Sequence, residues 1–362
     1  MPTFRPDLAA IPVYTPGRPI DEVARELGLS GIIKLASNEC PEAPFPEVQE
    51  AIAAATASLH RYPENSAYHL VSELAKVHDL PESYFWVGAG SSQLLGCTAL
   101  AVGGRGTSAV YASPSFVMYT IYAVLSGAES IEVPLDRGHA HDLDAMAAAI
   151  RPDTTVVYVC NPNNPTSTHV SGDALQAFVE SVPDGAVVVI DEAYAEYVTA
   201  PDFASAIPLA VARDNVIVAR TFSKAYGLAG LRVGYAIGQP ETLAQLRRTQ
   251  PPFSVTTLGQ VAATEALRHP DRLAKRVHDN AMGRAWLSVE LAARNVAVAP
   301  SQTNFVMVTG GRDAGRLAAR FLERGVIIRT FGPITRITVG TPEENARLIE
   351  VWDEITSAHP AD

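Results

Sequence analysis

The sequence predicts an α/β fold with a mostly parallel β-sheet between helices. Three short runs that are rich in β-branched residues, at 155–160, 186–190 and 216–219, are typical of strands buried on both faces. Amphipathic helical patterns lie between them, with apolar residues recurring every three or four positions over 143–150 and 174–179. Strands that alternate with helices form βαβ units, so we expect parallel neighbours in one sheet and helices on both of its faces.

The sequence changes character in its last third. Two adjacent prolines at 251–252 precede helix-rich sequence over 258–293 and several short strand patterns. A last helix is expected to begin in Thr341-Pro342-Glu343-Glu344, a capping-box pattern with proline at the first helical position. Because 362 residues exceed the usual length of one domain, we expect the chain to enter a second, smaller domain near the two prolines.

The composition excludes several classes of protein. The chain carries 28 basic and 39 acidic residues, a formal net charge of −11, which argues against nucleic acids and anionic membranes as partners. The nearly uncharged stretch over 83–128 contains too many glycine and hydroxyl residues for a membrane span. Three isolated cysteines, Cys40, Cys97 and Cys160, show no metal-ligand spacing, and the first residues resemble no signal peptide. We therefore expect a cytoplasmic protein with reduced thiols and no metal ion.

Three polar residues, Asn164, Asp191 and Lys224, each follow a different predicted strand. Taken singly, Asn164 could belong to an ordinary turn and Asp191 could cap the next helix. Because the carboxyl ends of parallel strands meet at one edge of a sheet, we expect the three side chains to form one site. A partly desolvated lysine can attack a carbonyl group to form a Schiff base, and a buried carboxylate can pair with a protonated heterocycle nitrogen.

Two glycine-rich patterns lie earlier in the chain. Gly88-Ala89-Gly90-Ser91-Ser92 opens a helical run, where small residues let backbone N–H groups approach a phosphate. A formal GxGxxA match over 104–109 runs into a strand instead of a helix, so its context argues against a dinucleotide site. His139 and His141 lie two residues apart in a polar stretch, and we expect both to be solvated loop residues.

Read together, three ordered motifs carry a family resemblance. NPNNPT (161–166), DEAY (191–194) and TFSKAYGLAGLRVGY (221–235) resemble the fold-type-I aminotransferases that use pyridoxal 5′-phosphate (PLP). Further strings, among them IKLASNE, RYPE, VGAGS and RITVGTPEEN, are similar to the histidinol-phosphate aminotransferase subfamily. The resemblance covers nearly the whole chain and implies the fold-type-I architecture, with a large PLP domain and a composite small one.

The resemblance implies roles around the cofactor. Lys224 would hold PLP as a Schiff base and then act as the general acid and base of the proton transfer. Asp191 would keep the pyridine nitrogen protonated. Tyr194 and Asn164 would hydrogen-bond the 3′-oxygen of the ring, and Phe116 would stack on its face. The phosphate would be bound by backbone and side-chain donors and one arginine, namely Gly90, Ser91, Thr221, Ser223 and Arg232.

The resemblance also implies substrate contacts and a dimer. Arg336 would clamp the α-carboxylate of an amino acid or oxo acid, and Arg329 and Tyr14 would contact the distal end of the substrate. Tyr62 would reach the cofactor phosphate from the neighbouring subunit, which implies a homodimer with shared sites.

The resemblance further implies a large domain over 38–250 and a small domain made of 1–37 and 251–362. The amino acceptor would be 2-oxoglutarate, and the first candidate donor is L-histidinol phosphate.

Two departures from the family pattern keep other substrates open. Ser167 stands where a glycine is usual, and serine does not freely adopt a positive φ. The same serine occurs in the aromatic amino acid aminotransferase branch, which makes phenylalanine or tyrosine the alternative donor. Cys40-Pro41-Glu42 also departs from the usual NENP string. A PLP-dependent decarboxylase of the threonine-phosphate type shares much of the same sequence pattern and is a third candidate.

Overall fold

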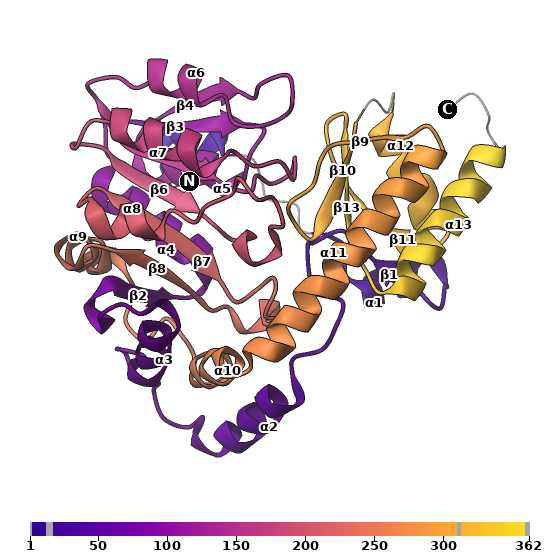
Figure 1. Cartoon of the computed structure of the whole chain (residues 1–362), viewed down its shortest axis with the longest axis horizontal. Coiled ribbons are helices and arrows are strands. Elements are labelled where there is room, and N and C mark those ends of the chain that lie inside the picture. The colour runs from indigo at the N-terminus through magenta and orange to yellow at the C-terminus, as the bar shows by residue number, and fades with distance from the viewer. Residues whose placement is uncertain (1, 12–16, 310–312, 359–362) are drawn as a thin grey trace.

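The computed structural model describes residues 2–11, 17–309 and 313–358 (Figure 1). The larger part of the molecule is built on a seven-stranded sheet, and a smaller sheet carries the yellow and orange C-terminal elements beside it. The seven strands lie in the spatial order β2 (Phe85–Gly88), β8 (Gly234–Gly238), β7 (Val216–Thr221), β6 (Val187–Asp191), β5 (Thr154–Cys160), β3 (Ser108–Ser113) and β4 (Glu129–Pro134).

The predicted strands are confirmed as parallel neighbours. β5 pairs with β6 and β6 pairs with β7 in parallel, and β8 is antiparallel to both of its neighbours. The sheet is therefore mostly parallel, as the alternation of strands and helices predicts. The β-branched residues of these strands are almost fully buried, since helices cover both faces of the sheet.

The helices cover the large sheet in three groups. One face packs against α4 (Gly90–Val102), α5 (Met118–Ser126) and α9 (Pro240–Leu246). The other face packs against α6 (Leu143–Ala148), α7 (Gly172–Ser181) and α8 (Ile207–Ala212). A further apolar cluster joins β2 and β8 to α2 (Pro46–Ala55), α3 (Tyr68–His78) and α10 (Thr257–Leu267).

The smaller part contains two sheets. A four-stranded sheet has the order β12 (Arg329–Phe331), β13 (Ile334–Thr338), β10 (Phe305–Thr309) and β9 (Ala297–Val298). A short parallel pair joins β1 (Ile33–Lys34) to β11 (Val326–Ile327). The helices here are α1 (Ile20–Leu27), α12 (Ala314–Glu323) and α13 (Pro342–Ala358), and α11 (Pro270–Ala293) runs from one part to the other (Figure 1).

Short 3₁₀ helices complete the described elements, at Pro6–Ala10, Thr56–Ser58, Glu82–Tyr84, Ala195–Tyr197, Ala229–Leu231 and Arg247–Thr249.

The capping box at the start of α13 is present. The Glu344 carboxylate accepts a hydrogen bond from the Thr341 N–H at 2.9 Å, and the Glu344 N–H donates to the Thr341 hydroxyl at 3.2 Å. Each side chain thus satisfies a backbone donor that the first turn of a helix leaves without a partner.

The packing of α10 bears on the expected domain boundary. Val255, Ala262 and Ala266 belong to the same buried cluster as residues of α2 and α3. The core of the larger part therefore continues beyond residue 250. The division into 38–250 and 1–37 plus 251–362 stays a prediction, and the packing favours moving its second boundary into α11.

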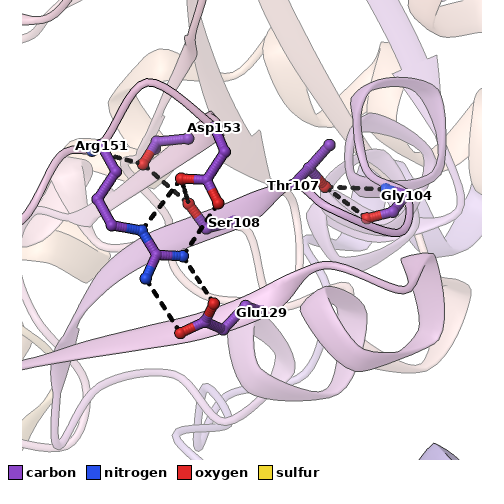
Figure 2. Close-up of polar contacts among 7 residues, drawn as sticks. Gly104, Thr107, Ser108, Glu129, Arg151 and Asp153 are labelled. Atoms are coloured by element: carbon purple, nitrogen blue, oxygen red, sulfur yellow. Dashed lines mark hydrogen bonds and ion pairs between the residues drawn. The ribbon is translucent and has the colours of Figure 1, made fainter.

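An exposed ion-pair network joins the amino end of β4, an outer strand of the sheet, to the residues before β5, as Figure 2 shows. Arg151 donates to Glu129 at 2.7 Å and to Asp153 at 3.0 Å, so it bridges β4 and the residues before β5. The Thr107 hydroxyl accepts from the Gly104 N–H at 3.0 Å and donates to the Gly104 carbonyl at 2.7 Å. The GxGxxA match therefore forms a turn that is closed by its own hydrogen bonds. This turn lies at the amino ends of the strands, whereas Asp191 lies at a carboxyl end.

The described residues include no helix that is both long and apolar enough to cross a membrane.

Candidate active site

The polar residues at the carboxyl ends of the strands line one cavity of about 340 Å³. The larger part of the molecule supplies most of its wall, and the rest comes from Gly17, from the segment over 36–39 and from β12 and β13. The wall contains these residues that the sequence singles out: Ser91, Phe116, Asn164, Asp191, Tyr194, Thr221, Ser223, Lys224, Arg232, Arg329 and Arg336. The expectation that Asn164, Asp191 and Lys224 meet at one sheet edge is therefore met in the structure.

Lys224 lines this cavity, three residues beyond the end of β7. Its Nζ is 3.5 Å from the Ser37 carbonyl oxygen and 5.8 Å from the centroid of the Tyr194 ring. Burial, and next the positive charge of Arg336, lower the pKa of Lys224 to about 8. An amine with this pKa is uncharged in about a tenth of the molecules at pH 7, far more than an ordinary lysine, and the uncharged form can attack a carbonyl carbon.

Asp191 ends β6 and is only 2% exposed. Its Oδ2 accepts a hydrogen bond from the Tyr119 hydroxyl at 2.9 Å, and its Oδ1 accepts one from the Ala193 N–H at 3.2 Å. Burial raises the pKa of Asp191 to about 6 in spite of these donors. A carboxylate in this position can stabilise a protonated ring nitrogen that enters the cavity.

The α-carboxylate candidate, Arg336, is buried and firmly held. Its Nη1 donates to the Asn164 Oδ1 at 2.6 Å, and its Nη2 donates to the Ala36 carbonyl oxygen at 2.7 Å. The carbonyl oxygen of the Asn164 amide thus accepts a hydrogen bond from Arg336. Its NH₂ group is therefore the end that can donate a hydrogen bond to a ligand. The neighbouring Tyr194 hydroxyl accepts a hydrogen bond from the Asn38 Nδ2 at 2.8 Å.

An anion cradle lies at the N-terminus of α4. Gly90 has a φ of 77°, and a Cβ at this position would come within 2.8 Å of the Arg232 Nη2. The guanidinium therefore approaches the first turn of the helix as closely as glycine allows. Its Nη1 lies 3.4 Å from the Ser223 hydroxyl, which in turn accepts from the Thr221 hydroxyl at 3.0 Å. Helix N–H groups, two hydroxyls and an arginine are the donors that a phosphate group requires.

Ser167 adopts a left-handed backbone conformation, which glycine adopts more easily than serine. Its φ is 65°, in the left-handed region, and its N–H donates to the Asn163 carbonyl oxygen at 2.9 Å. The turn is therefore formed with serine at a cost of about 1–2 kcal/mol in backbone strain. With serine at this position, Asn164 lines the cavity.

Two of the candidate residues do not lie at this cavity, and one lies outside the described residues. Gly90 is not among the residues that line the cavity, although it lies against Arg232, which lines it. Tyr62 is 82% exposed and stacks on Phe253, with ring centroids 4.8 Å apart. Tyr14 lies outside the described residues.

The sequence reasoning missed several residues that shape the site. Asn38 and Ser115 line the cavity, Phe331 lies near both arginines of the small sheet, and the Tyr119 hydroxyl donates to Asp191. The IKLASNE string was a signal for Asn38, and the three-residue spacing from Phe116 was a signal for Tyr119.

The expectation for His141 is wrong. Its side chain is 5% exposed, because the loop before α6 packs against the loop after β5, and burial lowers its pKa to about 4. His139 is exposed, as expected. Among the described residues, no group of histidine, cysteine or acidic side chains could hold a metal ion.

A second cavity, of about 540 Å³, lies beside α11. It is lined by Cys40, Tyr197, Arg276, Met282 and Trp286, among others. It contains neither the lysine nor the buried carboxylate, so the chemistry belongs to the smaller cavity.

The comparisons with known proteins agree with this geometry. The family model for aminotransferase class I and II matches residues 30–351. The chain belongs to this aminotransferase family. A histidinol-phosphate aminotransferase of Brevibacillus brevis is 40% identical over 351 residues, with 96% of each chain covered.

Two further relatives extend the comparison. An aromatic amino acid aminotransferase of Mycobacteroides abscessus is 42% identical, over 94% of this chain and 96% of its own. The crystal structure of histidinol-phosphate aminotransferase from Sinorhizobium meliloti, in complex with pyridoxal-5′-phosphate, superposes with a TM-score of 0.90. It is 28% identical, and 98% of each chain is covered.

The enzyme is a PLP-dependent transaminase with the fold-type-I architecture. The residues of its cavity fit this cofactor. The cradle between α4 and Arg232 fits the phosphate, the buried Asp191 fits the pyridine nitrogen, and Lys224 fits the aldehyde carbon. Its substrates are accordingly an amino donor and an oxo-acid acceptor.

Proposed function

We propose that this transaminase transfers an amino group from L-histidinol phosphate to 2-oxoglutarate. The observation that carries the proposal is the pair of arginines on β12 and β13. Arg329 and Arg336 are direct cross-strand partners, and both line the cavity beside Lys224. The phosphate of histidinol phosphate and the two carboxylates of 2-oxoglutarate are dianionic, so both substrates match two adjacent guanidinium groups. The relative in Brevibacillus brevis carries the name of this activity.

The proposed roles of the cavity residues follow from their positions. When PLP is bound, it withdraws electrons from the carbon that loses its proton. Lys224 would bind the aldehyde carbon and then move the proton at its Nζ. Asp191 would hold the proton of the pyridine nitrogen, while the Tyr194 hydroxyl and the Asn164 NH₂ group would bind the 3′-oxygen. The Phe116 ring would cover one face of the cofactor.

The phosphate of the cofactor would be held apart from the substrate. Gly90 and Ser91 would offer backbone N–H groups, Thr221 and Ser223 their hydroxyls, and Arg232 its guanidinium. This leaves Arg336 for the α-carboxylate of the oxo acid, and Arg329, together with Tyr14, for the distal anion of the substrate.

We further propose a homodimer in which Tyr62 reaches the partner's cofactor phosphate. The support is the exposed stacked pair that Tyr62 forms with Phe253, since large exposed aromatic groups are typical of protein interfaces. Sedimentation measurements test the dimer, and Tyr62→Ala should weaken PLP binding in it. A cytoplasmic location is supported by three free cysteines, Cys40, Cys97 and Cys160.

An aromatic amino acid is the second candidate donor. The Phe331 ring lies 5.4 Å from the Arg329 guanidinium carbon and 5.0 Å from that of Arg336, so the substrate side of the cavity also offers an apolar surface. The relative in Mycobacteroides abscessus bears this activity in its name. Under this alternative, Arg329 serves only the reaction with glutamate and 2-oxoglutarate.

Single-turnover rates measured separately for each half reaction distinguish the two donors. If histidinol phosphate is the donor, Arg329→Gln slows both its half reaction and that of glutamate. If phenylalanine is the donor, the same variant slows the glutamate half reaction and leaves the phenylalanine half reaction nearly unchanged. A large preference of the unmodified enzyme for phenylalanine contradicts the proposal. Release of carbon dioxide without transamination would instead support the decarboxylase alternative.

A further inference from the structure

The hydroxyl of Tyr119, a residue of α5, binds the carboxylate of Asp191 at the end of β6. Tyr119 is the second residue of α5, 72 positions before Asp191, and its hydroxyl donates to the Asp191 Oδ2 at 2.9 Å. Its side chain is fully buried, at 0% exposure. Because the Tyr119 hydroxyl is shielded from water, its hydrogen-bond partner must be a protein group, and the packing of the ring determines which group that is.

Three aromatic rings fix the Tyr119 ring. It stacks on Tyr158 with centroids 4.7 Å apart and an interplanar angle of 10°, and Tyr111 contacts it at 6.0 Å. The ring of Phe116 meets it edge-on, at 5.7 Å and 87°. The same side chain therefore supports Phe116, which lines the cavity, and Asp191, which is expected to face the pyridine nitrogen.

The surroundings of Asp191 show why this donor matters. Burial and the neighbouring carboxylate of Glu192 disfavour the anion, whereas the Tyr119 hydroxyl, the Ala193 N–H and the charge of Lys224 favour it. The other titratable groups that face it are Cys160 and Tyr194, whose ionisation its negative charge opposes. Of the side chains that favour the anion, Tyr119 has the larger effect.

We propose that Tyr119 is a positioning residue of the transaminase, which holds the Asp191 carboxylate as an anion in a fixed orientation toward the pyridine nitrogen of PLP. The Tyr119 hydroxyl donates to one oxygen of the Asp191 carboxylate, and the Ala193 N–H donates to the other. The two hydrogen bonds together fix the orientation of the carboxylate. This inference rests on the proposed role of Asp191. It goes beyond that role, because it names a residue of α5 that determines the charge and orientation of the Asp191 carboxylate.

The neighbouring Tyr158 offers a matched control. Its ring is the stacking partner of Tyr119 and is fully buried, but its hydroxyl has no hydrogen-bond partner among the described residues. Tyr119→Phe and Tyr158→Phe thus each remove one buried hydroxyl from the same aromatic stack. Only the first removes a donor to Asp191.

The first measurement is the dissociation constant of PLP for the apoprotein, with its dependence on pH. Tyr119→Phe should raise the dissociation constant about tenfold or more, as expected for a hydrogen bond to a charged group. PLP binding weakens as Asp191 takes up a proton, and without the donor its pKa rises. The acid side of the pH profile should therefore move to higher pH in Tyr119→Phe and stay in place in Tyr158→Phe.

The second measurement uses the loaded enzyme. The kcat of Tyr119→Phe should fall while the KM for the amino donor changes little, and the visible absorption of the bound cofactor should titrate differently from that of the unmodified enzyme. If Tyr119→Phe matches Tyr158→Phe in PLP affinity, pH profile and absorption, the proposal is wrong.

A third variant separates this proposal from the role of Asp191. If Asp191→Asn leaves PLP affinity and absorption unchanged, the proposed role of Asp191 fails, and this inference fails with it. If Asp191→Asn is impaired but Tyr119→Phe is not, only the role of Tyr119 is refuted. Should Tyr119→Phe fold poorly, 3-fluorotyrosine at position 119 gives a stronger donor of nearly the same shape. It should move the acid side of the profile to lower pH, and an unchanged profile contradicts the proposal.

Discussion

Arg329 and Arg336 lie directly opposite each other on β12 and β13, and both reach the cavity that contains Lys224. Like charges at directly opposed positions of a sheet destabilise it. Arg336 is held by Asn164 and by the Ala36 carbonyl oxygen, so its guanidinium has a fixed orientation. A pair of cations that costs stability, beside a lysine with a lowered pKa, is an arrangement suited to a substrate with two negative charges.

Arg336→Lys should reduce kcat/KM for glutamate about 10- to 100-fold, because an ammonium group cannot replace the bidentate contact of a guanidinium with a carboxylate. Steady-state kinetics with glutamate and 2-oxoglutarate measure the effect. Arg347→Lys is the control, since Arg347 lies on α13 and pairs with Glu350 at the surface. Equal activity of the two variants would contradict the proposed role of Arg336.

The rate at which the apoprotein binds PLP covalently should depend on the pKa of Lys224. Only the uncharged amine attacks the aldehyde, so the rate should rise with pH and level off above about 8. After burial, the charge of Arg336 is the main cause of the lowered pKa. Arg336→Met should therefore move the midpoint to higher pH, as followed by stopped-flow absorption. Lys224→Ala should abolish both the covalent bond and turnover, and residual transamination by this variant argues against the assigned role.

Gly90→Ala should weaken PLP binding roughly tenfold. The new Cβ would lie 2.8 Å from the Arg232 Nη2, and the φ of 77° is unfavourable for alanine by about 1–2 kcal/mol. Gly104→Ala is the matched control, because a Cβ there meets nothing within 4 Å at the opposite edge of the sheet. Fluorescence titration with PLP compares the two, and similar affinities would exclude the close approach of Arg232 as a feature of the phosphate site.

Glu192→Gln should lower the free energy of unfolding by up to about 3 kcal/mol, because it removes the nearer of the two carboxylates that pair with the buried Arg220 and leaves only Glu196, at 3.6 Å. The Glu192 carboxylate accepts from Arg220 at 2.6 Å and from Ser205 at 2.8 Å, and the Glu192 side chain is 1% exposed. By contrast, Arg151→Ala breaks the exposed network of Figure 2 and should cost much less stability, because solvent screens exposed ion pairs. Urea unfolding of both apoproteins gives the comparison. Equal losses would show that burial does not determine the strength of these pairs.

Much of the fold and part of the site could be predicted from local patterns. The strands that carry Asp191 and Lys224 have β-branched sequences that suit burial on both faces, and the capping box marks the start of α13. Polar residues that directly follow such strands are recognisable because the sheet brings the ends of its strands together. The position of α10 was not recognisable, since its apolar face fits either part of the molecule and only packing against α2 and α3 decides between them.

The sequence by itself predicted the α/β class, the family and the meeting of Lys224, Asp191 and Asn164 in one cavity, because strand burial and motif order are local properties of the chain. Only the tertiary structure decided which groups tune them. Tyr119 reaches Asp191 across 72 residues, and Arg336 reaches Asn164 across 172. Such contacts depend on how elements far apart in the chain pack against each other. Neither the spacing of motifs nor the hydrophobic pattern of a sequence specifies the distance between two such side chains.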